Sequence, residues 1–370
     1  LNEHPAYHPN GSSKVKHEYK NRPNLVGRWK GTGSGNGRSL IIAGHMDVVP
    51  PGDCSAWSYD PWGAEISPDG KIYARGAIDN KGPLAAAVMA AAILKEIGVK
   101  LDGDLILESV VDEEFGGGNG TLATILRGYQ ADGVISVEPS SLAVCPTTLG
   151  CVSISLMIEG VAAHGIEQWK GTNPIGSAVT LYQALPKWHR KRNQLAQKYP
   201  LLAVRPIPLP LICRTILAGA NLGGASIPSD CQLNLWLGIA PEEEWNDVEA
   251  ELQQFISEVA SAPEWTAPQP AKYQKLGRFL EGSQISNDHP LSRVLMESYF
   301  QVNKEKARLE CGTSGDLFIY TNYARIPGLI CGPGNLFLAH GIDEYIQIKD
   351  LLTAVKVYAL MITKWCELSD

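Results

Sequence analysis

The sequence predicts an α/β protein with a largely parallel sheet and a smaller α+β domain inserted into it. Short apolar stretches alternate with loops and helical stretches towards both ends of the chain, and this texture is interrupted from about residue 150 to residue 283. The length of 370 residues also exceeds what one compact core usually holds. We therefore expect one domain of residues 1–149 and 284–370 and an inserted domain of residues 150–283.

In the first domain, predicted strands and helices follow one another along the chain. Asn24–Trp29 and Ser39–Ala43 are predicted strands, joined as a hairpin by the Gly-rich loop Gly31–Gly37. The glycine spacing in this loop does not fit a dinucleotide-binding fingerprint, and a strand follows where a helix would be needed. An alanine-rich helix is predicted over Lys81–Ile97. The other predicted elements are the strands Leu105–Val111, Val134–Val137 and Gly328–Ile330 and the helices Pro290–Asn303 and Asp350–Trp365.

The inserted domain has its own pattern of strands and helices. Val152–Ile158 and Leu233–Ile239 are predicted strands, and Pro174–Leu185 is a predicted helix. Asp247–Val259 is a second helix, because its apolar residues recur at helical spacing. Lys187–Pro210, basic and then Pro-rich, is predicted to be a long loop.

Composition narrows the classes of function. The formal net charge of −7 and the pI near 5.7 disfavour a nucleic-acid partner, which would attract a basic protein. The most apolar helical run, Ala85–Leu94, is too short to cross a membrane, so we expect no membrane partner. Eight cysteines without a C-x-x-C pair predict reduced thiols and a cytoplasmic protein. Because the chain begins with Leu1 rather than Met, we expect its native start to lie upstream.

A histidine and two aspartates lie next to predicted elements of the first domain. His45 follows a strand, and Asp47 lies two residues further along, on the same face of an extended chain. A metal-binding imidazole commonly needs a carboxylate or carbonyl on its second nitrogen, which Asp47 can supply. Asp79 lies just before the alanine-rich helix. Taken singly, His45 also fits a structural histidine and Asp79 a helix N-cap.

Further acidic residues and a second histidine follow other strands. Glu113 and Glu114 come after one apolar strand. Glu138 lies at the end of the next apolar strand, and His340 follows a third apolar strand. On a surface loop the adjacent glutamates would be solvated charges, whereas beside a buried strand they need a cation or a proton. Together these side chains form an N/O ligand set that suits catalytic zinc, manganese or cobalt. Five ligands fit two ions about 3.5–4 Å apart that share one carboxylate.

Eight short segments run along the chain in the order in which they occur in one known family. They are Gly44–Pro51, Trp57–Trp62, Tyr73–Gly82, Asp112–Gly117, Val137–Pro139, Gly160–Gly165, Cys311–Asp316 and Ala339–Tyr345. By these segments the sequence resembles the dizinc hydrolases that include acetylornithine deacetylase, succinyl-diaminopimelate desuccinylase, aminoacylase and glutamate carboxypeptidase. Each segment is short, but the ordered set covers nearly the whole chain and is specific.

The resemblance implies a zinc-peptidase-like catalytic domain with an inserted ferredoxin-like lid domain, which closes over the substrate and pairs two subunits into a homodimer. It also implies two Zn²⁺ ions per chain, with Co²⁺ or Mn²⁺ as possible substitutes. The implied roles are that His45 and Glu138 hold one zinc, Glu114 and His340 hold the other, Asp79 bridges both, Glu113 is the general base and Asp47 supports His45.

The resemblance also implies residues that contact the substrate. His164 would reach a neighbouring subunit's site and stabilise the oxyanion, although it equally fits a polar loop histidine. Gly312 and Thr313 match a segment that contacts the substrate's carboxylate. These assignments belong to the resemblance and not to the spacing of the residues.

The sequence departs from the family pattern at several positions. Asn80 and Pro83 stand where the family usually has Met and Gly. Ala225 and Gly238 stand where an Asn and an Arg normally grip the substrate's α-carboxylate. A plain N-acyl-α-amino acid is therefore a less secure substrate. The first histidine ligand usually lies farther from the chain start, so we expect roughly one helix and one strand of the family to lie outside this sequence.

The function expected from these residues is hydrolysis of an amide bond in a small N-acylated amino acid or related amine. A metallo-exopeptidase acting on dipeptides or C-terminal residues of short peptides is the alternative with the same chemistry. A non-catalytic binding protein that keeps the fold is the alternative from a different class. Substrate turnover and metal content separate these three interpretations.

Overall fold

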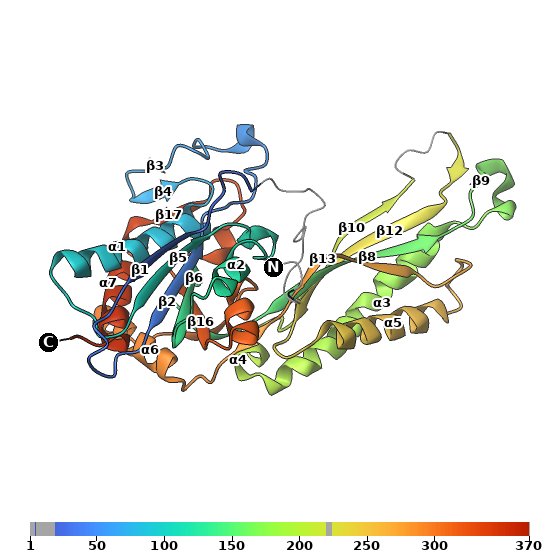
Figure 1. The fold of residues 1–370 in the computed structure, drawn as a ribbon. Helices are drawn as coiled ribbons and strands as arrows, with labels where there is room; N and C mark the ends of the chain where they lie inside the picture. The colour runs from blue at the N-terminus through green and yellow to red at the C-terminus, as the bar shows by residue number, and fades with distance from the viewer. Residues whose placement is uncertain (1–3, 5–18, 220–223, 370) are drawn as a thin grey trace. The chain divides into compact units, whose positions relative to one another are not determined.

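The computed structural model describes residue 4, residues 19–219 and residues 224–369. Figure 1 shows its fold. The chain forms two compact units, of which the first contains Leu1–Thr148 and Ser283–Asp370 and the second contains Leu149–Gly282. Each boundary lies within one residue of the boundary expected from the sequence. The second unit is therefore an insertion into the first.

The first unit is built on a mixed sheet that has eight strands within the described residues. Its main order is β1–β5–β2–β6–β16–β7–β14, and β15 also pairs with β7. The four pairings β5–β2, β2–β6, β6–β16 and β7–β15 are parallel, which confirms a largely parallel α/β sheet. The strands are β1 (Leu25–Trp29), β2 (Leu40–His45), β5 (Leu105–Val110), β6 (Gly133–Pro139), β7 (Val144–Thr148), β14 (Ser283–Gln284), β15 (Leu309–Gly312) and β16 (Gly328–Gly332).

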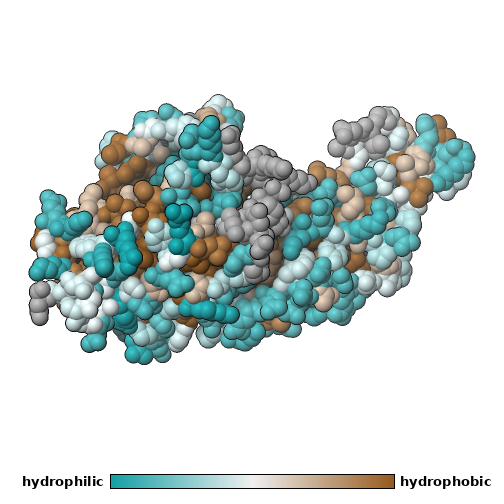
Figure 2. Space-filling view, in the orientation of Figure 1, coloured by the Kyte–Doolittle hydropathy of each residue, from teal (hydrophilic) through white to brown (hydrophobic). Residues whose placement is uncertain are grey.

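Three helices, α1 (Gly82–Glu96), α6 (Pro290–Asn303) and α7 (Ile348–Trp365), pack with the sheet in one hydrophobic core. Alanines of α1 are buried in this core. Each fully buried Leu or Ile in it contributes about 1.5–3 kcal/mol to the free energy of unfolding. The segment Ala77–Glu96 is long and apolar enough to cross a membrane by composition, but more than half of it is buried as a core helix. Figure 2 shows hydrophobic side chains that reach the surface over α1 and the adjoining strands.

The predicted hairpin of the first two strands is wrong. β5 lies between β1 and β2, pairing antiparallel with β1 and parallel with β2. The Gly-rich loop instead wraps around the carboxylate of Asp102, which accepts hydrogen bonds from the backbone amides of Ser34, Gly35 and Gly37 at 2.5, 2.8 and 2.6 Å. A strand inserted between two others cannot be recognised from the turn sequence alone.

A small sheet and short helices complete the first unit. The sheet runs in the order β17–β4–β3, and β17 leads directly into α7. The strands are β3 (Glu65–Ile66), β4 (Lys71–Tyr73) and β17 (Tyr345–Gln347). The helix α2 (Thr121–Leu126) contacts a π-helical turn over Ile319–Tyr323. This small sheet holds the chain that follows the loop of His340.

The second unit has the βαββαβ succession of a ferredoxin-like domain, as predicted. Its sheet order is β10–β12–β8–β13, with every neighbouring pair antiparallel. The elements are β8 (Gly150–Glu159), α3 (Pro174–Leu195), β10 (Leu211–Ala218), β12 (Asp230–Ile239), α5 (Trp245–Ala260) and β13 (Lys272–Leu280). The rings of Trp188 and Phe255 stack between α3 and α5 with centroids 4.7 Å apart. Short pieces are β9 (Ala163–His164), α4 (Pro200–Ala203) and β11 (Ser226–Ile227).

The predicted loop over Lys187–Pro210 is wrong in its first part. α3 continues through Pro186 to Leu195, and a short helical turn and α4 follow. Arg192 is buried and pairs with the carboxylates of Glu243 and Glu251 at 3.2 and 2.6 Å. These tertiary contacts hold the last turns of the helix despite the internal proline.

Candidate metal centre

The first side chains of the site lie at or just after the ends of three neighbouring parallel strands. β5, β2 and β6 lie side by side, and their carboxyl ends meet at one edge of the sheet. His45 is the last residue of β2, Glu138 lies near the end of β6, and the turn Glu113–Phe115 follows β5. In α/β sheets this edge is where ligands bind.

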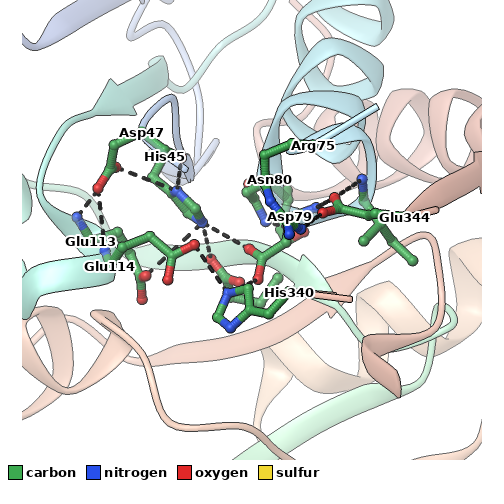
Figure 3. Close-up of polar contacts among 12 residues, drawn as sticks. His45, Asp47, Arg75, Asp79, Asn80, Glu113, Glu114, His340 and Glu344 are labelled. Atoms are coloured by element: carbon green, nitrogen blue, oxygen red, sulfur yellow. Dashed lines mark hydrogen bonds and ion pairs between the residues drawn. The ribbon is translucent and has the colours of Figure 1, made fainter. Parts of the chain in front are cut away.

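Asp79 lies between the two histidines of the site. It comes from a π-helical turn over Ala77–Lys81 that leads into α1. Its Oδ1 is 2.9 Å from Nε2 of His45, and its Oδ2 is 3.2 Å from Nε2 of His340. Figure 3 shows these side chains converging from separate elements. Each oxygen thus faces a different imidazole, which is the arrangement of a carboxylate that can bridge two ions.

A glutamate stands beside each histidine. Oε1 of Glu138 is 3.7 Å from Nε2 of His45, and Oε1 of Glu114 is 3.1 Å from Nε2 of His340. Possible ligand atoms of His45, Asp79 and Glu114 lie within 4.8 Å of one another. The structure therefore brings the five side chains expected as ligands into two groups that share Asp79.

Asp47 lies behind His45 and also holds the turn that carries the paired glutamates. Nδ1 of His45 is 3.0 Å from the backbone oxygen of Asp47 and 3.4 Å from its carboxylate. The same carboxylate accepts hydrogen bonds from the backbone N–H groups of Glu113 and Glu114 at 3.4 and 3.3 Å. A proton on Nδ1 leaves the lone pair of Nε2 free to bind a metal.

Glu113 faces the same space from the side of β5. Its Oε2 is 3.9 Å from Nε2 of His45. Gly315 lies directly against its carboxylate, because a Cβ on this glycine would be 2.9 Å from Oε1 of Glu113. The segment that follows β15 therefore forms a wall of the site beside Glu113.

The electrostatics of the cluster favour a bound cation. Burial and the charges of neighbouring carboxylates raise the pKa of Glu138 to about 8 and hold the pKa of Glu113 well above its usual range. Hydrogen bonds to Asp79 and Glu114 raise the pKa of His340 to about 10. Burial alone would raise the pKa of Asp79, but its bonds to both histidines lower it. A divalent ion would compensate these buried carboxylates, and the N/O donor set fits zinc, manganese or cobalt.

Glu344 and Arg75 support the site although the sequence did not indicate a role for them. The carboxylate of Glu344 is buried, pairs with Arg75, and accepts hydrogen bonds from the N–H groups of Ile78 and Asp79 at 3.0 and 3.3 Å. It thereby fixes the backbone that carries the bridging aspartate. Both residues lie in segments that carry the resemblance, but nothing in the sequence shows that they are buried together.

The remaining predicted residues lie in different parts of the chain. Gly312 ends β15, is buried, and pairs with Thr148 of β7, and Thr313 follows it. His164 lies in the second unit, where its exposed ring accepts a hydrogen bond from the N–H of Ile166 at 3.2 Å. The substrate contacts of these three residues stay predictions.

An α/β unit with an inserted ferredoxin-like unit and a cluster of N/O donors at the carboxyl ends of its parallel strands is an arrangement typical of metal-dependent hydrolases. Residues 41–364 match the family described as Peptidase family M20/M25/M40. The chain belongs to this family and is therefore a hydrolase that acts on amide bonds.

Individual relatives resemble the chain over most of its length. It is 28% identical over 365 residues to the N-formyl-4-amino-5-aminomethyl-2-methylpyrimidine deformylase of Bacillus subtilis (strain 168), covering 94% of this chain and 84% of the relative. It is 27% identical over 341 residues to a probable succinyl-diaminopimelate desuccinylase of Staphylococcus aureus (strain MSSA476), covering 86% and 81%. The crystal structure of the M20 family metallo-carboxypeptidase Sso-CP2 from Sulfolobus solfataricus shares the fold, with a TM-score of 0.74, 18% identity and coverage of 93% and 88%.

Proposed function

We propose that this protein is a dinuclear zinc amidohydrolase that removes a small acyl group from an amine. The position of Asp79 carries this proposal, because its two oxygens face the imidazoles of His45 and His340 separately. In this assignment His45 and Glu138 hold one ion, and Glu114 and His340 hold the other. When bound, the two ions would supply Lewis acidity and lower the pKa of the attacking water towards about 7.

Glu113 is the proposed general base. It faces the site beside His45 without being needed as a ligand, and Gly315 leaves room for its carboxylate. It takes the proton of the attacking water while the water oxygen bonds to the acyl carbon. It then returns that proton to the leaving nitrogen as the C–N bond breaks, which gives a carboxylate and a free amine. Asp47 keeps the ring of His45 and the Glu113 backbone in place throughout.

The lid favours amines without an α-carboxylate as substrates. Gly238 stands where the family usually has the arginine that grips this group, and a Cβ there would lie 2.8 Å from Cδ of Pro210. The backbone N–H of Gly238 also donates to the carbonyl of Pro210 at 2.7 Å, which holds the proline against this position, so a side chain here would have to displace Pro210. One relative is a deformylase of an aminomethylpyrimidine. We therefore place N-formylated and N-acetylated amines ahead of N-acyl-α-amino acids and dipeptides.

A substrate panel on metal-reconstituted protein tests this function. The panel pairs N-formyl, N-acetyl and N-succinyl derivatives of an aminomethylpyrimidine with the same derivatives of an α-amino acid, and adds dipeptides. We expect the highest kcat/KM among the acylated amines and two zinc ions per chain by elemental analysis. Higher kcat/KM for dipeptides would favour the exopeptidase alternative. Less than one zinc, cobalt or manganese ion per chain after reconstitution would favour a binding protein.

We also propose a homodimer formed through the second unit. β10 is the edge strand of its sheet, and Ile212, Ile216 and Leu217 on this strand are about half exposed. Val179 and Tyr182 expose apolar side chains on α3, which contacts β10. An exposed apolar edge strand is a template for pairing with a second copy. In such a dimer His164 would stabilise the oxyanion in the partner's site.

A reducing compartment such as the cytoplasm is the proposed location. All eight cysteines are free thiols in the structure. Titration of the denatured protein under non-reducing conditions should find eight thiols per chain, and a lower number in freshly purified protein would contradict this proposal.

A further inference from the structure

Asn80 is a buried polar residue that lies between the ends of two strands of the site. Its side chain is fully buried, directly after Asp79. The ladder between β2 and β6 runs from Leu40 paired with Gly133 to its last pair, Ala43 with Ser136. The next residues of the two strands, Gly44 and Val137, are the ones that the Asn80 side chain meets.

The carboxamide contacts both strands at this point. Its Nδ2 donates a hydrogen bond to the backbone oxygen of Val137 at 3.1 Å. Its Oδ1 lies against Gly44, where a Cβ would be only 2.5 Å away. Gly44 immediately precedes His45, and Val137 immediately precedes Glu138. One side chain therefore touches the neighbour of each ligand proposed for the first ion. Asn80 itself directly follows the bridging Asp79, and Figure 3 shows the two residues together.

This placement contributes to the separation of the two ligands. The β2–β6 ladder ends before Gly44 and Val137, and at this point the Asn80 side chain lies between the two strands and bonds to β6, while β2 stays paired with β5. Nε2 of His45 and Oε1 of Glu138 are 3.7 Å apart. Two ligands bound at about 2.1 Å in a tetrahedral site lie roughly 3.4 Å from each other. The spacing set across Asn80 is thus close to the one that an ion needs.

We propose that Asn80 is a positioning residue for the ion held by His45 and Glu138. This inference rests on the proposed metal assignment and adds to it a reason why this chain carries Asn beside the bridging aspartate. The ion held by Glu114 and His340 depends less on Asn80, because neither of those residues adjoins Gly44 or Val137. Loss of the carboxamide should therefore lower the binding affinities of the two ions by different amounts.

The test compares Asn80→Ala with Tyr358→Phe. Tyr358 is equally buried in the same unit and donates one hydrogen bond to the backbone oxygen of Cys331 at 2.8 Å. Metal-free protein is titrated with Zn²⁺ against a chromophoric chelator, and the melting temperature of the metal-free protein is recorded. For Asn80→Ala we expect one of the two dissociation constants to rise about 10- to 100-fold. For Tyr358→Phe we expect a lower melting temperature with both constants unchanged.

A second variant approaches the same contact from the other side. Gly44→Ala places a methyl group against Oδ1 of Asn80 and against the side chain of Val137. Gly44→Ala should lower the affinity for the same ion as Asn80→Ala does. Unchanged affinity for that ion would contradict the proposal.

Further outcomes separate this inference from the metal assignment. If Asn80→Ala binds both ions as wild type does, or if both affinities fall equally, the inference is wrong. If Asn80→Ala does not fold, Asn80→Ser replaces it, and failure of both to fold would show a folding role and overturn the inference. If the wild type itself does not bind two ions, the metal assignment is what fails.

Discussion

Glu113 is the residue on which catalysis by this protein should depend most. Its burial among other carboxylates keeps its pKa well above the usual range, and the cations proposed beside it would favour the charged form that accepts a proton. Glu113→Gln keeps the size of the side chain but removes the proton acceptor. We expect kcat to fall about 10²- to 10⁴-fold with two ions still bound. Steady-state kinetics and elemental analysis of the same preparation check this, and a normal rate would remove Glu113 from the mechanism.

Asp79 and His340 should differ in how many ions depend on them. Asp79 faces both histidines, whereas His340 contacts only Asp79 and Glu114 among the ion pairs of the described residues. Asp79→Ala should therefore weaken the binding of both ions, and His340→Ala should leave one ion bound per chain. Metal content after dialysis against a metal-free buffer measures the difference. Equal losses in the two variants would contradict a bridging role for Asp79.

Residue types and their strand-end positions predicted the candidate ligands and Asp47 behind His45, but not the Glu344–Arg75 pair that supports Asp79. His45, Glu114 and Glu138 follow apolar strands that can be recognised in the sequence, and parallel pairing brings such ends together. The burial of Glu344 with Arg75 depends on two segments 269 residues apart. No local pattern distinguishes such a buried glutamate from a solvated one.

At the level of elements, the carboxylate of Asp102 accepts most of the side-chain hydrogen bonds that hold the Gly-rich loop, and Asp104 accepts one more from Gly31. Hydrogen bonds from the backbone N–H groups of Gly37, Gly35 and Ser34 lower the pKa of Asp102 below its usual value. A group with a lowered pKa stabilises the folded state above its ordinary pKa of about 3.9, and this contribution is lost as the pH falls through the lowered value. The loop is therefore expected to loosen in acid.

Asp102→Asn tests this dependence on pH. The amide keeps one acceptor oxygen but turns N–H groups towards other N–H donors of the loop. We expect a melting temperature a few degrees below that of the wild type at pH 7. The difference should begin to shrink below about pH 3.9, where the carboxyl of the unfolded chain becomes protonated, and shrink further as the pH falls through the lowered pKa of the folded state. Thermal unfolding across this pH range measures it, and a difference independent of pH would contradict the interpretation.

The two corrected elements share a physical cause. Sequence patterns report local preference, so the basic and Pro-rich composition of Lys187–Pro210 predicted a loop and Gly31–Gly37 predicted a hairpin turn. In the fold, the pairing of buried Arg192 with two glutamates extends the helix, and the strand from Leu105 to Val110 inserts between the two that the loop joins. Long-range contacts decided both.

For the whole molecule, the proposed dimer makes a prediction about the edge of the second unit. Ile216→Lys puts a charge on the exposed edge strand β10, which disfavours pairing with another copy. We expect sedimentation to show a dimer for the wild type and a monomer for this variant. Ile207→Lys is the matched control, since Ile207 is also about half exposed in the same unit but lies outside the strands. A monomeric wild type would contradict the proposal.

The sequence by itself determined the α/β class, the inserted domain and the residue types of the site, because hydrophobic periodicity, glycines and strand-end acids are local features. Only the tertiary structure decided the strand order, the length of α3 and the contact of Asn80 with Gly44 and Val137. These three features depend on the packing of segments that are far apart in the chain. A local sequence pattern does not show which of those segments will bury a given side chain.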